Sequence, residues 1–193
     1  MGQLRNLFAI IGLVVAISGG YAYSKLAPIL SEFDPGYMKM YTEFAGKLLT
    51  TKDPGMAMMW SVPVEDPDLT PEDVIDSLKS LAAAKNFLFV GEAPFYKQVQ
   101  AVTGEPYRFI TFLSFCDARV GKMMADYKDA YTGFMPCRIS VVEDKQGKLW
   151  LFSMNLDMMI YGGKKLPEEL RAEALRVSGV IQSMMQGAAK GEF

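Results

Sequence analysis

The side chains with the most distinctive chemistry in this chain are two cysteines, Cys116 and Cys137, in a sequence of 193 residues that contains no histidine. Without histidine, the Ser–His and Cys–His nucleophile pairs, the usual catalytic zinc sites and a histidine-ligated haem are excluded. No glycine-rich phosphate-binding loop is present either. The sequence therefore favours a non-enzymatic protein, for which we expect no catalytic residues and no cofactor.

The two cysteines allow three interpretations. Cys116 ends a predicted strand over residues 107–116, and Cys137 directly precedes another over 138–143. If these strands are antiparallel neighbours, the two sulfurs approach each other. They could form a disulfide that closes a loop of about twenty residues and contributes roughly 3 kcal/mol. They could instead pack as two buried, unpaired thiols, or act as a functional pair that binds a soft metal or handles sulfur or electrons.

Methionine is abundant, with 14 residues in the chain. Met56, Met58 and Met59 give a Met-x-Met spacing of the kind that thioether sites use for Cu(I), and Met38 with Met40 repeats it. Copper is therefore the alternative to having no cofactor, with Met56, Met58 and Met59 as candidate ligands. Methionine is also a flexible core filler, and packing explains the same spacing.

The first thirty residues predict a membrane anchor and the compartment in which the rest of the chain lies. No charged residue occurs between Leu7 and Ser24, and 18 helical residues span about 27 Å, close to the thickness of a bilayer's hydrocarbon core. Arg5 on the near side favours a cytoplasmic N-terminus. We expect a single-pass anchor in the inner membrane, with the C-terminal domain in the periplasm. A cleaved signal peptide is the competing interpretation, because residues 16–18 resemble a cleavage site.

The rest of the chain predicts one α+β domain. We expect a transmembrane anchor over 1–30, a linker helix over 31–56 and the domain over 57–193. Within these we predict an extended segment over 56–64, a helix that starts at Thr70, a short buried strand over 87–90, helices over 94–102 and 117–128, strands over 107–116, 138–143 and 149–156, and a last helix from Pro167 to Gly187. Residues 144–147 have the composition of a hairpin turn, so the sheet is predicted to be largely antiparallel.

Charge argues against nucleic acid as a partner. Residues 31–193 carry 18 basic and 22 acidic residues, a net charge of −4, and no basic cluster. The acidic side chains are scattered and are predicted to lie on the solvated surface.

Several motifs resemble the domain of unknown function family 302. They are Phe115-Cys116-Asp117, the run from Met135-Pro136-Cys137-Arg138 to Asp144, Gly147-Lys148, and the strand that ends at Asn155. The resemblance covers about residues 62–159 and implies a small α+β domain that often self-associates, with both cysteines at family positions. It implies no reaction. Leu156 stands where proline is usual and Asn86 where glycine is typical. The anchor, the helix around Tyr37 and the C-terminal helix look like additions.

Two classes of function follow. In the first, the domain is a non-catalytic accessory or binding subunit of a membrane-associated complex, of an electron-transfer or sulfur-related kind, that contacts a protein partner or a second copy. In the second, it is a thiol module that uses Cys116 and Cys137 for redox chemistry, sulfur handling or Cu(I) binding.

Overall fold

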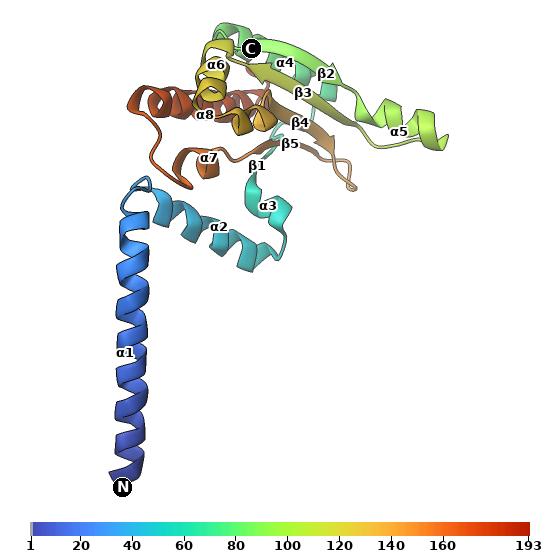
Figure 1. Cartoon of the computed structure of the whole chain (residues 1–193). Coiled ribbons are helices and arrows are strands. Elements are labelled where there is room, and N and C mark those ends of the chain that lie inside the picture. Colours follow the sequence, from blue (N-terminus) through green and yellow to red (C-terminus); the bar gives the residue numbers. More distant parts are fainter. Residues whose placement is uncertain (1) are drawn as a thin grey trace.

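The computed structural model describes residues 2–193 and begins with a long helix that stands apart from the rest of the chain (Figure 1). This helix, α1, runs from Gly2 to Leu30. Within the described residues, Leu4–Leu30 is the one stretch that is long and apolar enough to cross a membrane, and none of it is buried in the protein. The N-terminal helix is therefore a candidate membrane anchor.

The domain that follows contains five strands and seven α-helices among the described residues. The elements after the anchor are α2 (Tyr37–Thr51), α3 (Pro54–Met58), β1 (Met59–Pro63), α4 (Pro71–Ala84), β2 (Leu88–Ala93), α5 (Phe95–Thr103), β3 (Ile110–Cys116), α6 (Ala118–Tyr127), the 3₁₀ helix η1 (Asp129–Phe134), β4 (Cys137–Glu143), β5 (Leu149–Met154), α7 (Asp157–Tyr161) and α8 (Glu168–Ala188). The predicted fold class, α+β with an N-terminal apolar helix, is confirmed.

The strands form one antiparallel sheet in the order β1-β5-β4-β3-β2. The hairpin predicted at residues 144–147 joins β4 to β5, with Val141 opposite Leu151. Strands β3 and β4 are antiparallel neighbours, as required for the two cysteines to approach each other, and Phe115 lies opposite Cys137. The sheet therefore brings the end of β3 and the start of β4 to the same edge of the domain.

The core lies between the sheet and helices α4 and α8, which pack against each other. Side chains alternate along the central strands, and Leu113, Ile139 and Leu151 are fully buried. Helix α4 begins at the predicted residue because Thr70 and Asp73 form a reciprocal capping box. The sequence pattern and the packing agree here.

Two local predictions were wrong. Residues 56–64 were expected to be extended, but 54–58 form α3, because Asp53 accepts a hydrogen bond from the Met56 amide and Pro54 occupies the first turn. The strand over 87–90 was expected to be buried, but only Phe87 is buried, and β2 presents Leu88 and Val90 to solvent. An apolar run does not reveal that its strand lies at the edge of the sheet.

Candidate functional site

A short segment after α1 fixes the anchor to the domain. The backbone of residues 32–34 pairs with residues 163–165: the Asp34 amide donates to the Gly163 carbonyl, and the Lys165 amide donates to the Glu32 carbonyl. Asp34 is fully buried and accepts a hydrogen bond of 2.6 Å from Nε of Arg171 on α8. These contacts determine where the next helix, α2, begins.

Helix α2 covers a cavity close to this junction. The cavity has a volume of about 350 Å³ and lies between α2, η1 and α7. We call it the α2 cavity. Its walls are mostly apolar, with a few charged side chains. The apolar lining residues include Met40, Phe44, Met58, Tyr131, Phe134 and Met158, and the charged ones are Glu43, Lys47, Lys128 and Asp157.

The methionines predicted as copper ligands do not line one cavity together. Met58 lines the α2 cavity, whereas Met56 and Met59 line a separate hollow of about 340 Å³ between the end of α2, β1 and α8. The α2 cavity instead gathers methionines from distant parts of the chain, including Met40, Met154 and Met159. No spacing in the sequence predicts this group of methionines, because they come together only when α2 packs on α7.

The two cysteines line a second, smaller cavity of about 60 Å³. We call it the thiol cavity. Both thiols are free. The thiol cavity shares Tyr131, Phe134 and Met159 with the α2 cavity, so the two lie side by side. Antiparallel pairing of β3 and β4 is what brings the cysteines together, as the sequence predicted from the strand ends.

The environment of the thiols disfavours their ionised forms. Burial raises the pKa of Cys137 to about 11, and the nearby Cys116 adds to the increase. Burial and the neighbouring carboxylate of Asp117 also raise the pKa of Cys116. Both groups therefore carry their protons at neutral pH, which makes them poor nucleophiles in this structure.

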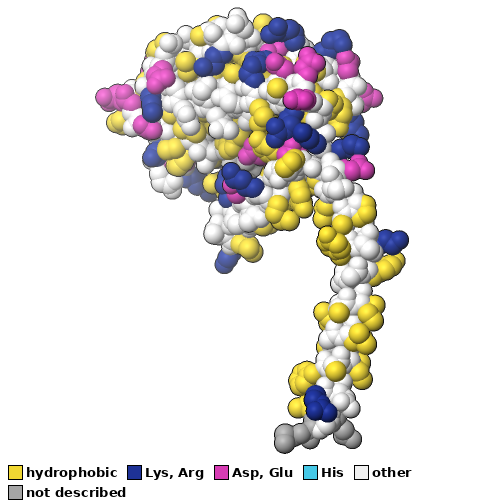
Figure 2. Space-filling model, turned by 90° about the vertical axis from the view of Figure 1, so that its left-hand side faces the viewer, with side chains coloured by type: hydrophobic (Ala, Val, Ile, Leu, Met, Phe, Trp, Pro, Cys, Tyr) yellow, Lys and Arg dark blue, Asp and Glu magenta, His cyan; other side chains and the backbone are white. Residues whose placement is uncertain are grey.

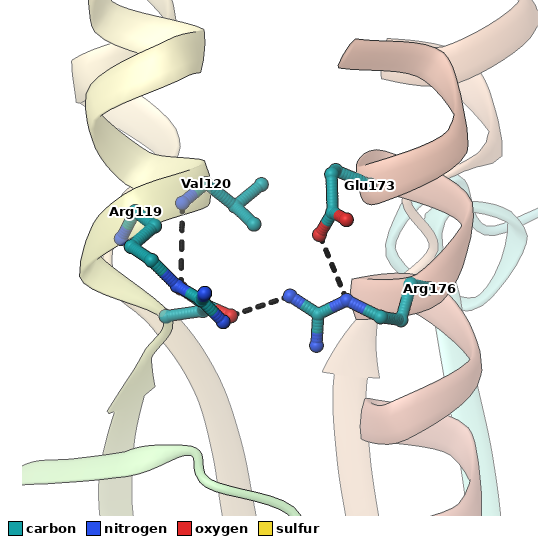
Figure 3. A network of polar contacts seen from close by, with 5 residues as sticks. Arg119, Val120, Glu173 and Arg176 are labelled. Carbon is teal, nitrogen blue, oxygen red and sulfur yellow. Dashed lines mark hydrogen bonds and ion pairs between the residues drawn. The ribbon is translucent and has the colours of Figure 1, made fainter. Parts of the chain in front are cut away.

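Asp117 lines the thiol cavity and is joined to α8 through Arg176. Figure 3 shows Arg119 and Val120 of α6 on one side of this contact and Glu173 and Arg176 of α8 on the other. Its carboxylate caps α6 by accepting hydrogen bonds from the amides of Arg119 and Val120, and it forms an ion pair with Arg176, which also contacts Glu173 at 2.8 Å. Burial would raise the pKa of Asp117, but the hydrogen bonds from Arg176 and the two amides lower it below its usual value. The carboxylate is therefore a fixed negative charge beside Cys116.

The prediction that the acidic side chains lie on the solvated surface was wrong for Asp34 and Asp117, which are both buried. Each is paired with an arginine of α8, Arg171 or Arg176. The sequence contains a signal for Asp117, because an aspartate between a strand and a helix is a typical N-cap. For Asp34 it contains none, since its partner lies 137 residues away.

The described residues do not bring together the side chains that most often bind metal ions. The part of the chain that the structure describes contains no cluster of three or more Cys, Asp or Glu side chains that could hold a metal ion. A soft metal at the thiol cavity would therefore depend on the two thiols and on thioether sulfurs.

The architecture is that of a small α+β domain with an antiparallel sheet, preceded by a long apolar helix. The sequence profile described as "Domain of unknown function DUF302" matches residues 60–188. This chain belongs to that family. The match reaches the end of α8, so the expectation that the C-terminal helix is an addition was wrong.

A solved structure shows the same fold. The crystal structure of an uncharacterized conserved protein DUF302 from Bacillus stearothermophilus is similar with a TM-score of 0.55 at 13% sequence identity, over 67% of this chain and 96% of that chain. None of the curated proteins matches this chain. At this identity the similarity establishes the fold alone.

Proposed function

We propose that this protein is a membrane-anchored, non-catalytic binding protein whose domain faces the periplasm and takes an apolar or amphipathic small molecule into the α2 cavity. The observation that carries the proposal is the cavity itself. Its volume of about 350 Å³ lies within the range of about 300–1,000 Å³ that is typical of small-molecule sites. It lies under the first helix after the anchor, where a molecule leaving the bilayer would reach it.

The lining indicates the chemistry of the ligand. Phe44, Tyr131 and Phe134 supply aromatic surface, and the methionines supply flexible thioethers that adapt to ligands of different shape. Lys47 and Lys128 are exposed residues of the same lining. Glu43 and Asp157 balance these two charges. A ligand with an apolar body and a polar end suits this arrangement, because the body makes apolar contacts and the end remains near the charged side chains.

The protonation of the cysteines and the pairing of the buried aspartates support binding rather than catalysis. The two thiols are protonated, and the fixed carboxylates of Asp34 and Asp117 are held by arginines. A protein of this kind would pass its ligand to a partner in a membrane complex or to a second copy of the chain. Purification of the full chain in mild detergent, followed by native mass spectrometry, would detect either companion.

The binding proposal is tested with decanoic acid as the probe. The α2 cavity holds about a dozen water-sized groups at about 30 Å³ each, which matches the size of this molecule. Native mass spectrometry of the full chain counts bound decanoate after the detergent is removed. Ala130→Phe places an aromatic ring at the cavity, and Ala172→Phe, on the exposed side of α8, is the matched control.

We expect one decanoate bound by the wild type and the control, and at least about tenfold weaker binding by Ala130→Phe, which corresponds to about 1.4 kcal/mol. Equal binding by all three proteins would contradict the proposal.

A second candidate is a Cu(I) site in the thiol cavity, favoured by one observation: Cys116 and Cys137 line the same cavity as Met124, Met135 and Met159. Thiolate and thioether sulfurs are the ligands that Cu(I) prefers. A bound metal would displace the thiol protons, so the raised pKa values weaken binding at neutral pH, and more so in acid, without preventing it. Redox or sulfur-transfer chemistry would require a free thiolate, which this environment disfavours.

The copper candidate is tested by titrating the full chain with Cu(I) under anaerobic conditions and weighing the complex. One ion per chain is expected for the wild type and none for Cys137→Ser. Copper that binds equally to both would reject this candidate while leaving the binding proposal for the α2 cavity intact.

A further inference from the structure

Helix α2 has two apolar sides, and only one of them is used by the domain. Met40 is buried, and Phe44 and Leu48 are half-buried toward the rest of the domain. Met38, Ala45 and Leu49 lie seven and four residues apart and therefore share another side of the helix. We call these three residues the outer stripe.

The outer stripe is exposed in the folded chain. Met38 is 59% exposed and Leu49 is 77% exposed. Met56 of α3, which follows α2 closely, is also exposed. Side chains of this size are usually removed from water when they are grouped. Something outside the described chain is therefore needed to cover the outer stripe.

The position of α2 identifies what covers it. Tyr21 and Tyr23 are exposed on α1, and the Lys25 ammonium lies 5.7 Å from the centre of the Tyr21 ring. Tyrosine and lysine at the end of an apolar helix are typical of the membrane–water interface, so this level of α1 marks the outer surface of the bilayer. Helix α2 runs sideways from the top of α1 and descends toward this level (Figure 1).

The junction holds α2 in that position. The Asp34–Arg171 ion pair and the backbone pairing of residues 32–34 with 163–165 join the end of α1 to α8. The Tyr41 hydroxyl donates a hydrogen bond of 2.8 Å to the Gly162 carbonyl. Helix α2 is consequently attached to the domain and the anchor at once. In Figure 2, hydrophobic side chains continue from α1 onto the part of the domain next to its upper end.

We propose that α2 lies in the outer interface of the bilayer, with the outer stripe of Met38, Ala45 and Leu49 inserted among the lipid headgroups and upper acyl chains. Lys39 and Lys52 are exposed near the two ends of the helix, where they can reach anionic headgroups. The α2 cavity then lies directly on the membrane. This inference rests on the membrane anchoring in the proposed function, but not on the identity of the ligand.

The test measures the depth of single fluorescent labels in lipid. The full chain is reconstituted in vesicles of zwitterionic and anionic phospholipid, and a bimane label is attached to Leu49→Cys or Met38→Cys. Val102→Cys on α5, which is 88% exposed, is the control outside the membrane. Val14→Cys in the middle of α1 reports whether the anchor spans the bilayer. The unsubstituted chain gives the background from Cys116 and Cys137.

We expect a nitroxide attached to the lipid headgroup or upper acyl chain to quench the labels at positions 38 and 49 several-fold more than the label at 102. A quencher deep in the acyl chains should affect only the label at 14. Quenching at 14 with none at 38 and 49 would overturn the inference and leave the anchor standing. No quenching at 14 would instead reject the anchoring itself.

A protein partner on the outer stripe gives a different result. The labels at 38 and 49 would then emit at short wavelength but escape the lipid quenchers, and the inference would fail. Using two positions of the stripe guards against a single variant that does not fold, which circular dichroism would reveal.

Discussion

The two neighbouring cavities of this domain differ in what encloses them. The α2 cavity, of about 350 Å³, is closed by a helix that belongs to the anchor side of the chain, whereas the thiol cavity, of about 60 Å³, is enclosed by the sheet, α6 and α8. The α2 cavity therefore depends on one peripheral helix, whereas the thiol cavity is part of the core. A cavity large enough for a ligand forms where a peripheral helix covers the core, because the core itself is packed too densely to hold one.

Each cavity also has its own buried ion pair to α8. Asp34–Arg171 holds the segment before α2, and Asp117–Arg176 holds the start of α6 beside the thiols. Disturbing one pair should therefore change one cavity and spare the other. The predictions below use this separation.

The largest effect is expected in acid, where both pairs are lost together. Burial alone would raise the pKa of Asp34 and of Asp117, but hydrogen bonds from the arginines and from backbone amides lower both below their usual value. In the unfolded chain these groups titrate near about 3.9. The stability that they contribute is therefore fully present above about pH 4 and falls as the pH drops through the folded pKa values.

Urea unfolding at a series of pH values measures this loss. The double variant Asp34→Asn, Asp117→Asn should be less stable at neutral pH and should lose less stability on acidification. A wild type and a double variant with the same pH dependence would show that these pairs are not the acid-sensitive groups.

Asp34→Ala should have the next largest effect. It leaves the partly buried Arg171 without a partner, and breaking a buried ion pair of this kind costs about 3 kcal/mol. Limited proteolysis should then cut α2, and decanoate binding should fall, while the thiols stay protected from a thiol reagent. Exposure of the thiols in this variant would contradict the separation of the two cavities.

Asp117→Ala should give the converse result. It removes the cap of α6 and the partner of Arg176, at a cost of about 2 kcal/mol, less than for Asp34 because Arg176 is partly solvated. The thiols should react faster with the reagent, and α2 should remain resistant to protease. Unchanged thiol reactivity would indicate that α6 keeps its position without this contact.

The smallest effect is expected for Cys137→Ser, which should lower the free energy of unfolding by about 1 kcal/mol. The substitution places a hydroxyl in the largely apolar thiol cavity, which offers it little hydrogen bonding. Cys137→Ala is the control that removes the sulfur without adding a polar group. If both variants are equally stable and bind decanoate as the wild type does, the thiol cavity is a packing feature. A much larger loss in Cys137→Ser than in Cys137→Ala would confirm that the cavity excludes polar groups.

Most of the fold could be predicted from the sequence, because its signals are local. The apolar run of residues 7–24, the Thr70 capping box and the hairpin turn at 144–147 each determine their own element through chain length, hydrogen bonding at a helix end or turn geometry. The strand positions also predicted that Cys116 and Cys137 would be near each other. The Asp53-Pro54 start of α3 is a local signal of the same kind, which the extended prediction for residues 56–64 overlooked.

The candidate site was determined only by the tertiary structure. The α2 cavity joins residues of α2 to residues of α7 more than a hundred positions later, together with residues of η1, and Asp34 contacts Arg171 only once α8 has packed. Burial turned aspartates that look like surface residues into fixed structural charges, and it raised the pKa values of the thiols. A sequence determines which side chains are available, but desolvation and long-range neighbours decide their chemistry, and these exist only in the folded chain.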